Sequence, residues 1–130
     1  MTIDRSRKNT GDIGETIASK FLERRGFKIL ERNFRRPWGE IDIIAERGSV
    51  IRFVEVKTVS RESLRDTLTE RDGYRPEEQV HPAKLRRLVR TAELYMSSKN
   101  DNREFQIDVV GVFLDHSHRV ARCRLFEQVL

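Results

Sequence analysis

Apolar residues recur along this chain with two different periods, which predict two kinds of secondary structure. Alternation at every second position, with many β-branched and aromatic residues, is typical of strands that bury one face. It predicts strands at residues 27–34, 39–44, 53–57, 105–114 and 120–126. Apolar spacings of three and four predict two amphipathic helices, one before the first strand and one between the third and fourth strands.

The first predicted helix runs to about Arg25 and ends at Gly26, and either Thr10 or Asp12 could cap its start. Its apolar side consists of Ile13, Ile17, Ala18, Phe21 and Leu22. Glu15 lies at the margin of that side, where it could face a neighbouring sheet edge. From the residues alone, the preferred interpretation of Glu15 is an ordinary first-turn acid that the helix dipole favours.

The second predicted helix runs from about Pro82 to Ser98, with Leu85, Leu88, Val89, Ala92 and Tyr95 facing inward. The element order is therefore αβββαββ, which predicts a mixed α/β layer architecture. A chain of 130 residues is long enough for one core, so a single domain over residues 1–130 is expected.

The second and third predicted strands carry acids at matching positions. Residues 39–44 read Gly-Glu-Ile-Asp-Ile-Ile, residues 53–57 read Phe-Val-Glu-Val-Lys, and a turn-like segment joins them. If this hairpin folds about Gly48 and Ser49, Asp42 lies opposite Glu55, with the side chains roughly 5 Å apart. Lys57 is two residues beyond Glu55 and shares its face.

Two carboxylates on one face repel each other unless a cation lies between them. Mg²⁺ prefers oxygen ligands, acidifies a bound water and neutralises charge on a phosphate. Asp42 and Glu55 are thus candidate metal ligands, and Lys57 a candidate catalytic cation. From spacing alone, an ordinary cross-strand salt bridge explains these three residues equally well.

A resemblance adds to this pattern. The order of these residues, Asp42, a turn and then Glu55-x-Lys57, is similar to the PD-(D/E)xK motif of restriction-endonuclease-like nucleases. Together with residues 11–15 (Gly-Asp-Ile-Gly-Glu), 33–36 (Asn-Phe-Arg-Arg) and 107–110 (Ile-Asp-Val-Val), the whole chain resembles the YraN-type uncharacterised protein family. That family is thought to share its fold with archaeal Holliday junction resolvases.

The resemblance implies a restriction-endonuclease-like mixed β-sheet flanked by helices. It also implies a catalytic set of Glu15, Asp42, Glu55 and Lys57, with Asp42 and Glu55 binding Mg²⁺ or Mn²⁺. The chain departs from the family pattern at Val59 and Gln106, where arginine often stands, which could alter phosphate contacts or substrate preference. A shared fold does not by itself guarantee shared chemistry.

The net charge of +5 comes with a strong preference for arginine, which supplies 20 of the 26 basic residues. Guanidinium groups bind phosphates bidentately, so this bias favours a nucleic-acid partner, although a solvated basic surface would look the same. The expected nucleic-acid contacts are Arg35, Arg36, Lys84 and Arg87. Trp38 could stack on a base or wedge at a branch point, or pack in a core or a dimer contact.

Other features limit the alternatives. The single cysteine, Cys123, excludes an intramolecular disulfide and fits a small core thiol better than a nucleophile. No segment has the length and apolarity of a membrane span or a signal peptide, so a cytoplasmic protein without a membrane partner is expected.

Residues 60–79 are predicted to form a long loop, either a flap over substrate or an unstructured insertion. Asp108 could support the site or satisfy a buried hydrogen-bond network.

The leading hypothesis is therefore a divalent-metal-dependent endonuclease that hydrolyses phosphodiester bonds in DNA, including branched or structured DNA. The alternative is a non-catalytic nucleic-acid-binding module that retains the nuclease fold. A homodimer is expected only by analogy with resolvases, which cut both strands of a junction symmetrically.

Overall fold

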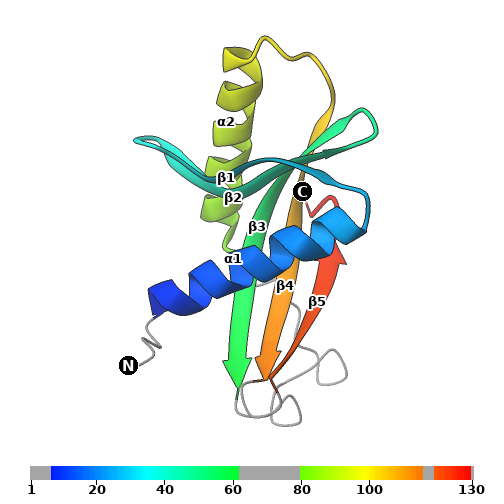
Figure 1. The fold of residues 1–130 in the computed structure, drawn as a ribbon. Coiled ribbons are helices and arrows are strands. Elements are labelled where there is room, and N and C mark those ends of the chain that lie inside the picture. Colours follow the sequence, from blue (N-terminus) through cyan, green and yellow to red (C-terminus); the bar gives the residue numbers. More distant parts are fainter. Residues whose placement is uncertain (1–6, 62–79, 116–118, 130) are drawn as a thin grey trace.

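The computed structural model describes residues 7–61, 80–115 and 119–129, which form a five-stranded sheet flanked by two helices (Figure 1). Along the chain these are α1 (Arg7–Arg24), β1 (Lys28–Arg36), β2 (Gly39–Arg47), β3 (Val50–Arg61), α2 (Pro82–Ser98), β4 (Phe105–Asp115) and β5 (Val120–Phe126). The predicted order αβββαββ is confirmed.

The sheet has the strand order β1-β2-β3-β4-β5. Neighbouring strands are antiparallel except β3 and β4, which are parallel because α2 lies in the connection between them. β1 and β2 run at a steep angle to the other three strands, so the sheet is strongly twisted (Figure 1). The architecture is the mixed α/β class that the sequence predicts.

The two helices begin and end for local reasons. α1 starts at Arg7, earlier than the predicted caps Thr10 and Asp12, because residues 7–10 contain no glycine or proline to stop a helix. It ends where Gly26 adopts a φ of 88° and the N–H of Phe27 donates to the carbonyl of Leu22 at 3.1 Å. In α2, the Nδ1 of His81 accepts from the N–H of Ala83 at 3.0 Å and caps the first turn.

Each face of the sheet is covered by one helix. On the α2 side, the ring of Tyr95 packs edge-on against Phe34 and Phe53, with ring centroids 5.3 and 5.6 Å apart. On the α1 side, Ala18 and Leu22 are buried against Val54, Val110 and other strand residues. Because both faces of β3 are buried, its mostly apolar sequence suits the centre of the sheet.

The hairpin between β2 and β3 is the one predicted. Gly48, with a φ of 63°, and Ser49 form its turn, and the register runs from Arg47 opposite Val50 to Ile43 opposite Val54. β3 is longer than predicted and pairs with β4 along its length, as far as Arg61. The first two residues of the predicted 60–79 loop thus belong to β3, and residues 62–79 lie outside the described residues.

Candidate functional site

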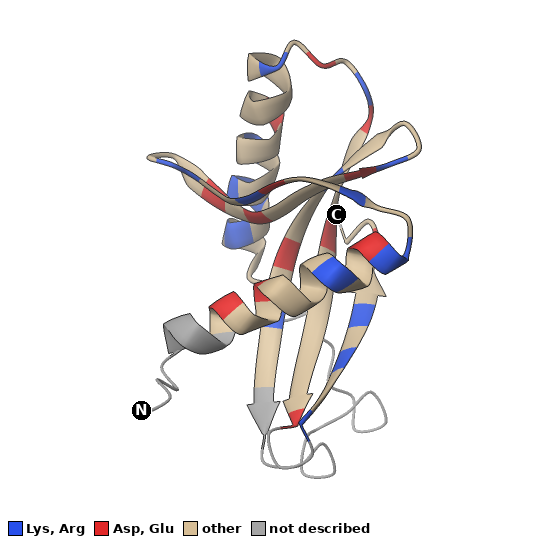
Figure 2. Cartoon of the chain, viewed as in Figure 1, with Lys and Arg blue, Asp and Glu red and all other residues tan. Residues whose placement is uncertain are grey.

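Three acids from three different elements meet near the middle of the sheet. Asp42 and Glu55 lie one step beyond the Ile43–Val54 pair of the hairpin, and α1 supplies Glu15. The carboxyl of Asp42 interacts with those of both Glu15 and Glu55. We call these three residues the acid cluster; acidic positions on α1 and on the strands are red in Figure 2.

Asp42 is held in place by the backbone of the neighbouring strand. Its Oδ2 accepts a hydrogen bond from the N–H of Val56 at 2.8 Å. Burial outweighs this bond and, together with the nearby Glu15, raises the pKa of Asp42 to about 6. The carboxyl is thus oriented by the backbone of β3.

Glu55 is 5% exposed, and burial together with the charge of Asp42 raises its pKa to about 7. Two lysines oppose this rise. The Nζ of Lys84, from α2, lies 2.5 Å from Oε1 of Glu55, and the Nζ of Lys57 lies 3.9 Å from the same oxygen. Burial lowers the pKa of Lys84, but its hydrogen bond and attraction to Glu55 outweigh burial and raise it.

Glu15 reaches the cluster because of the glycine that precedes it. Gly14 is buried against Thr58 of β3, and a Cβ at this position would overlap the Thr58 hydroxyl. The missing side chain therefore lets α1 approach β3 closely. Glu15 Oε2 is buried and has no hydrogen-bond partner among the described residues.

The residue types of the acid cluster are those that a hard divalent cation prefers as ligands. All three are carboxylates, one buried oxygen has no hydrogen-bond partner among the described residues, and burial raises the pKa values of Asp42 and Glu55. In the described part of the chain, no group of three or more His, Cys, Asp or Glu is arranged to hold a metal ion. Mg²⁺ commonly takes only one or two carboxylates and completes its shell with water and phosphate oxygens.

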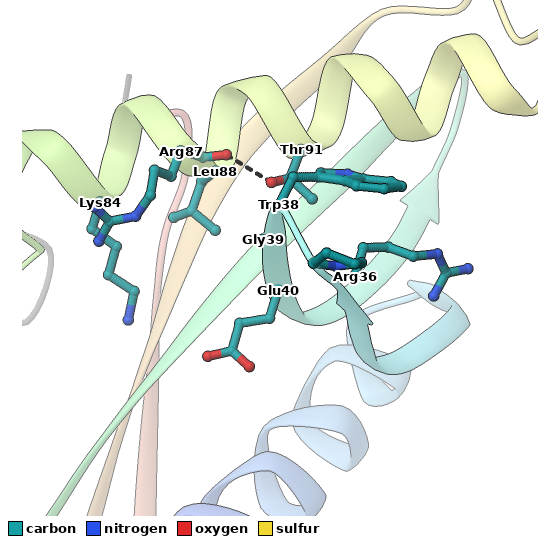
Figure 3. Close-up of a pocket in the computed structure, with 9 residues that line it drawn as sticks. Arg36, Trp38, Gly39, Glu40, Lys84, Arg87, Leu88 and Thr91 are labelled. Carbon is teal, nitrogen blue, oxygen red and sulfur yellow. Dashed lines mark hydrogen bonds between the residues drawn. The ribbon is translucent and has the colours of Figure 1, made fainter.

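Beside the acid cluster lies a pocket of about 360 Å³ between the β1–β2 turn and α2 (Figure 3). We call it the basic pocket, because three of its residues are cationic. It is lined by Arg36, Pro37, Trp38, Gly39, Glu40, Lys84, Arg87, Leu88 and Thr91. Lys and Arg positions, blue in Figure 2, also mark the first half of α2.

Three of the four predicted nucleic-acid contacts, Arg36, Lys84 and Arg87, line this pocket. Arg35 is exposed, outside the pocket lining, and its Nε lies 3.6 Å from Glu40. Trp38 is 49% exposed, so a core position is excluded for it. Sequence reasoning placed Lys84 at a phosphate but missed its ion pair with Glu55, since no local signal connects residues on different elements.

Asp108 belongs to a separate network on the α1 side of the sheet. Its carboxylate is fully buried and accepts from Arg52 at 2.9 Å, from the Gln106 side chain at 2.9 Å and from the Gln128 N–H at 2.8 Å. Arg52 also binds Glu127 at 2.8 Å. Asp108 therefore satisfies a buried network, and Gln106 takes part in it.

Cys123 is partly buried beside the α1-side core, where burial raises the pKa of its thiol. It packs in the way expected of a small apolar residue. His116 and His118, expected to be surface residues, lie outside the described residues. No helix in the described ranges is both long enough and apolar enough to cross a membrane.

The mixed sheet, its flanking helices and the Asp-turn-Glu-x-Lys hairpin define a restriction-endonuclease-like α/β fold. The chain belongs to the Uncharacterised protein family UPF0102, whose pattern matches residues 14–112. It is 42% identical to a UPF0102 protein of Moorella thermoacetica, over 93% of this chain and 92% of that one. A UPF0102 protein of Caldicellulosiruptor saccharolyticus is 39% identical over 94% of this chain and 97% of its own. The predicted YraN-type family is thereby confirmed.

Proposed function

We propose that this protein is a divalent-metal-dependent endonuclease that hydrolyses phosphodiester bonds in DNA, including branched or structured DNA. The observation that carries the proposal is the acid cluster, in which the carboxyls of Asp42 and Glu55, both with raised pKa values, interact with each other beside Lys57. A cluster built only for stability would gain more from apolar residues, because buried like charges are costly.

Within this proposal, Asp42 and Glu55 hold Mg²⁺ or Mn²⁺, and Glu15 supplies a further carboxylate from α1. The bound ion would acidify a water and neutralise charge on the phosphate. Lys57 orients the attacking water or stabilises the developing negative charge. The Val56 N–H keeps Asp42 oriented, so the residues need little rearrangement before reaction.

The basic residues around the cluster suit a polyanionic substrate. Arg36, Lys84 and Arg87 lie on one side of the acids, and together they would offset the repulsion between the carboxylates and the phosphate backbone. We extend the proposal to a cytoplasmic location and to a homodimer, in which a two-fold axis would present two sites to a symmetric junction.

A second function is favoured by one observation, the contact between Lys84 and Glu55. If Lys84 is the permanent partner of Glu55, the acids need no metal and the protein is a nucleic-acid-binding module without catalysis. The two functions differ in what metal does. Only the enzyme requires it, whereas the binding module responds chiefly to salt.

The test is a cleavage assay on single-stranded, duplex, flap and four-way-junction DNA with Mg²⁺, Mn²⁺ or EDTA. Wild type is compared with Asp42→Asn/Glu55→Gln and with Glu93→Gln, which removes an exposed acid of α2. The endonuclease predicts metal-dependent cleavage by wild type and Glu93→Gln that is lost in the double variant. Salt-sensitive binding without cleavage, in wild type as in the variants, would assign the binding module instead.

A further inference from the structure

The basic pocket combines an exposed aromatic ring with cationic side chains. Trp38, the only tryptophan of the chain, is about half exposed at the turn between β1 and β2. Three cations and one acid, Glu40, line the same pocket. Lys84 extends from α2 and Glu40 from β2 (Figure 3). Aromatic rings beside basic groups are the typical binding surface for unpaired nucleic acid, since a base stacks while its phosphate is neutralised.

The turn that carries Trp38 is held firmly against α2. Gly39 packs so closely on Thr91 that a Cβ would overlap the Thr91 hydroxyl. Thr91 is itself 1% exposed, and its hydroxyl donates to the carbonyl of Arg87 at 2.8 Å. The turn that carries the indole is therefore fixed by its packing on α2. A fixed turn reduces the conformational entropy that is lost when a flat ligand binds to the indole.

The pocket is continuous with the acid cluster through one residue. Lys84 lines the pocket and also lies 2.5 Å from Glu55. A phosphate bound by Lys84 would therefore be next to the acids, and the nucleotide attached to that phosphate would be at the pocket. A volume of about 360 Å³ suits a ligand of nucleotide size.

We infer that the basic pocket is a subsite for one unpaired nucleotide adjacent to the scissile phosphate, with its base stacked on Trp38. This inference rests on the proposed function and narrows its substrates to DNA that offers an unstacked nucleotide, such as a single strand, a flap or a branch point. An uninterrupted duplex is a poorer ligand, because a base must first leave the stack.

Binding can be measured without cleavage, in EDTA, by the fluorescence of Trp38, which is the only indole present. Titration with a short oligothymidylate should quench this fluorescence in a saturable way, and a duplex of equal length should quench it less. By fluorescence anisotropy of a labelled oligothymidylate, Trp38→Ala should bind about tenfold more weakly, and Trp38→Phe should retain part of the affinity.

Arg87 and Arg90 provide a matched pair on α2, because both are exposed and only Arg87 lines the pocket. Arg87→Gln should weaken oligothymidylate binding several-fold, and Arg90→Gln should weaken it clearly less. If the two variants lost the same amount of affinity for oligothymidylate, the DNA would be attracted to the charge of the helix in general. That result would contradict a specific subsite at the pocket. Circular dichroism of each variant checks that the fold is retained.

The subsite and the enzyme can fail separately. Unchanged Trp38 fluorescence and wild-type affinity in Trp38→Ala would overturn the subsite, even if metal-dependent cleavage were observed. Trp38 fluorescence that depends on protein concentration and not on DNA concentration would also overturn the subsite. It would assign Trp38 to a contact between copies of the chain. Saturable quenching with no cleavage under any metal would support the binding of an unpaired nucleotide at the pocket, but it would reject the endonuclease and with it a scissile phosphate next to the pocket.

Discussion

The Nζ of Lys84 lies 2.5 Å from Oε1 of Glu55, although the two residues belong to a helix and a strand and are 29 positions apart in the sequence. This ion pair joins the acid cluster to the basic pocket. In a half-buried site, each partner changes the protonation of the other, so the pair can be tested by titration as well as by activity.

Replacing Lys84 by Met should raise the pKa of Glu55 further above about 7, because a charge and a hydrogen bond that lower it are removed. Lys84→Arg keeps the charge and should give a smaller change. The measurement is a pH titration of the Glu55 side-chain carboxyl carbon by NMR, in EDTA. A titration curve that Lys84→Met leaves unmoved would show that the ion pair does not persist in solution.

Stability without metal should fall as pH rises from about 4 to about 7. The folded-state pKa values of Asp42 and Glu55 are about 6 and 7, against ordinary values of 3.8 and 4.5, so the folded protein holds protons that the unfolded chain has released. Urea unfolding in EDTA at pH 5 and pH 8 measures this. Asp42→Asn should reduce the pH dependence and be more stable than wild type at pH 8 by about 1–2 kcal/mol.

Asp42→Asn removes the charge of the side chain and keeps its hydrogen bond, because the Asn side-chain oxygen can still accept from the Val56 N–H. The unfolding experiment on this variant therefore isolates the effect of the charge. Saturating Mg²⁺ should stabilise wild type and have less effect on the variant. A wild-type free energy of unfolding that rises between pH 5 and pH 8 would mean that other groups outweigh the acid cluster.

Gly14→Ala should destabilise the fold by about 1–3 kcal/mol, because the new Cβ overlaps Thr58 and forces α1 away from β3. Gly11 is the control, since it lies in the same helix and a Cβ there meets nothing within 4 Å. Gly11→Ala should be neutral or stabilising by up to about 1 kcal/mol. Thermal unfolding of Gly14→Ala/Thr58→Ala should show partial recovery, and no recovery would place the clash elsewhere.

Asp108→Asn should be among the most destabilising changes of a polar residue, by about 3–5 kcal/mol, because it leaves Arg52 without its fully buried partner. Glu127→Gln also removes an anion from Arg52, but this side chain is 46% exposed, so the loss should be much smaller. Chemical denaturation of both variants checks the order. Similar losses of unfolding free energy in the two variants would show that the buried Arg52–Asp108 pair contributes no more to stability than the exposed Arg52–Glu127 pair.

Much of the hairpin follows from local pattern. Alternating residues and a Gly-Ser turn determine which face each side chain of β2 and β3 takes, so the approach of Asp42 to Glu55 could be predicted from spacing. The boundaries of α2 followed in the same way from its proline start and its apolar periodicity. The start of α1 could not be predicted in this way. Thr10 and Asp12 are favourable capping residues, but the helix begins at Arg7, so both lie inside it.

The chain itself thus determined the order of elements, the hairpin register and the pair of opposed acids, because these depend on neighbours close in sequence. Only the tertiary structure decided that Glu15 reaches Asp42, that Lys84 pairs with Glu55, and that Asp108 serves a different network. These contacts depend on how closely α1 and α2 approach a twisted sheet. That approach is set by packing at Gly14 and Gly39, whose partners Thr58 and Thr91 are distant in sequence.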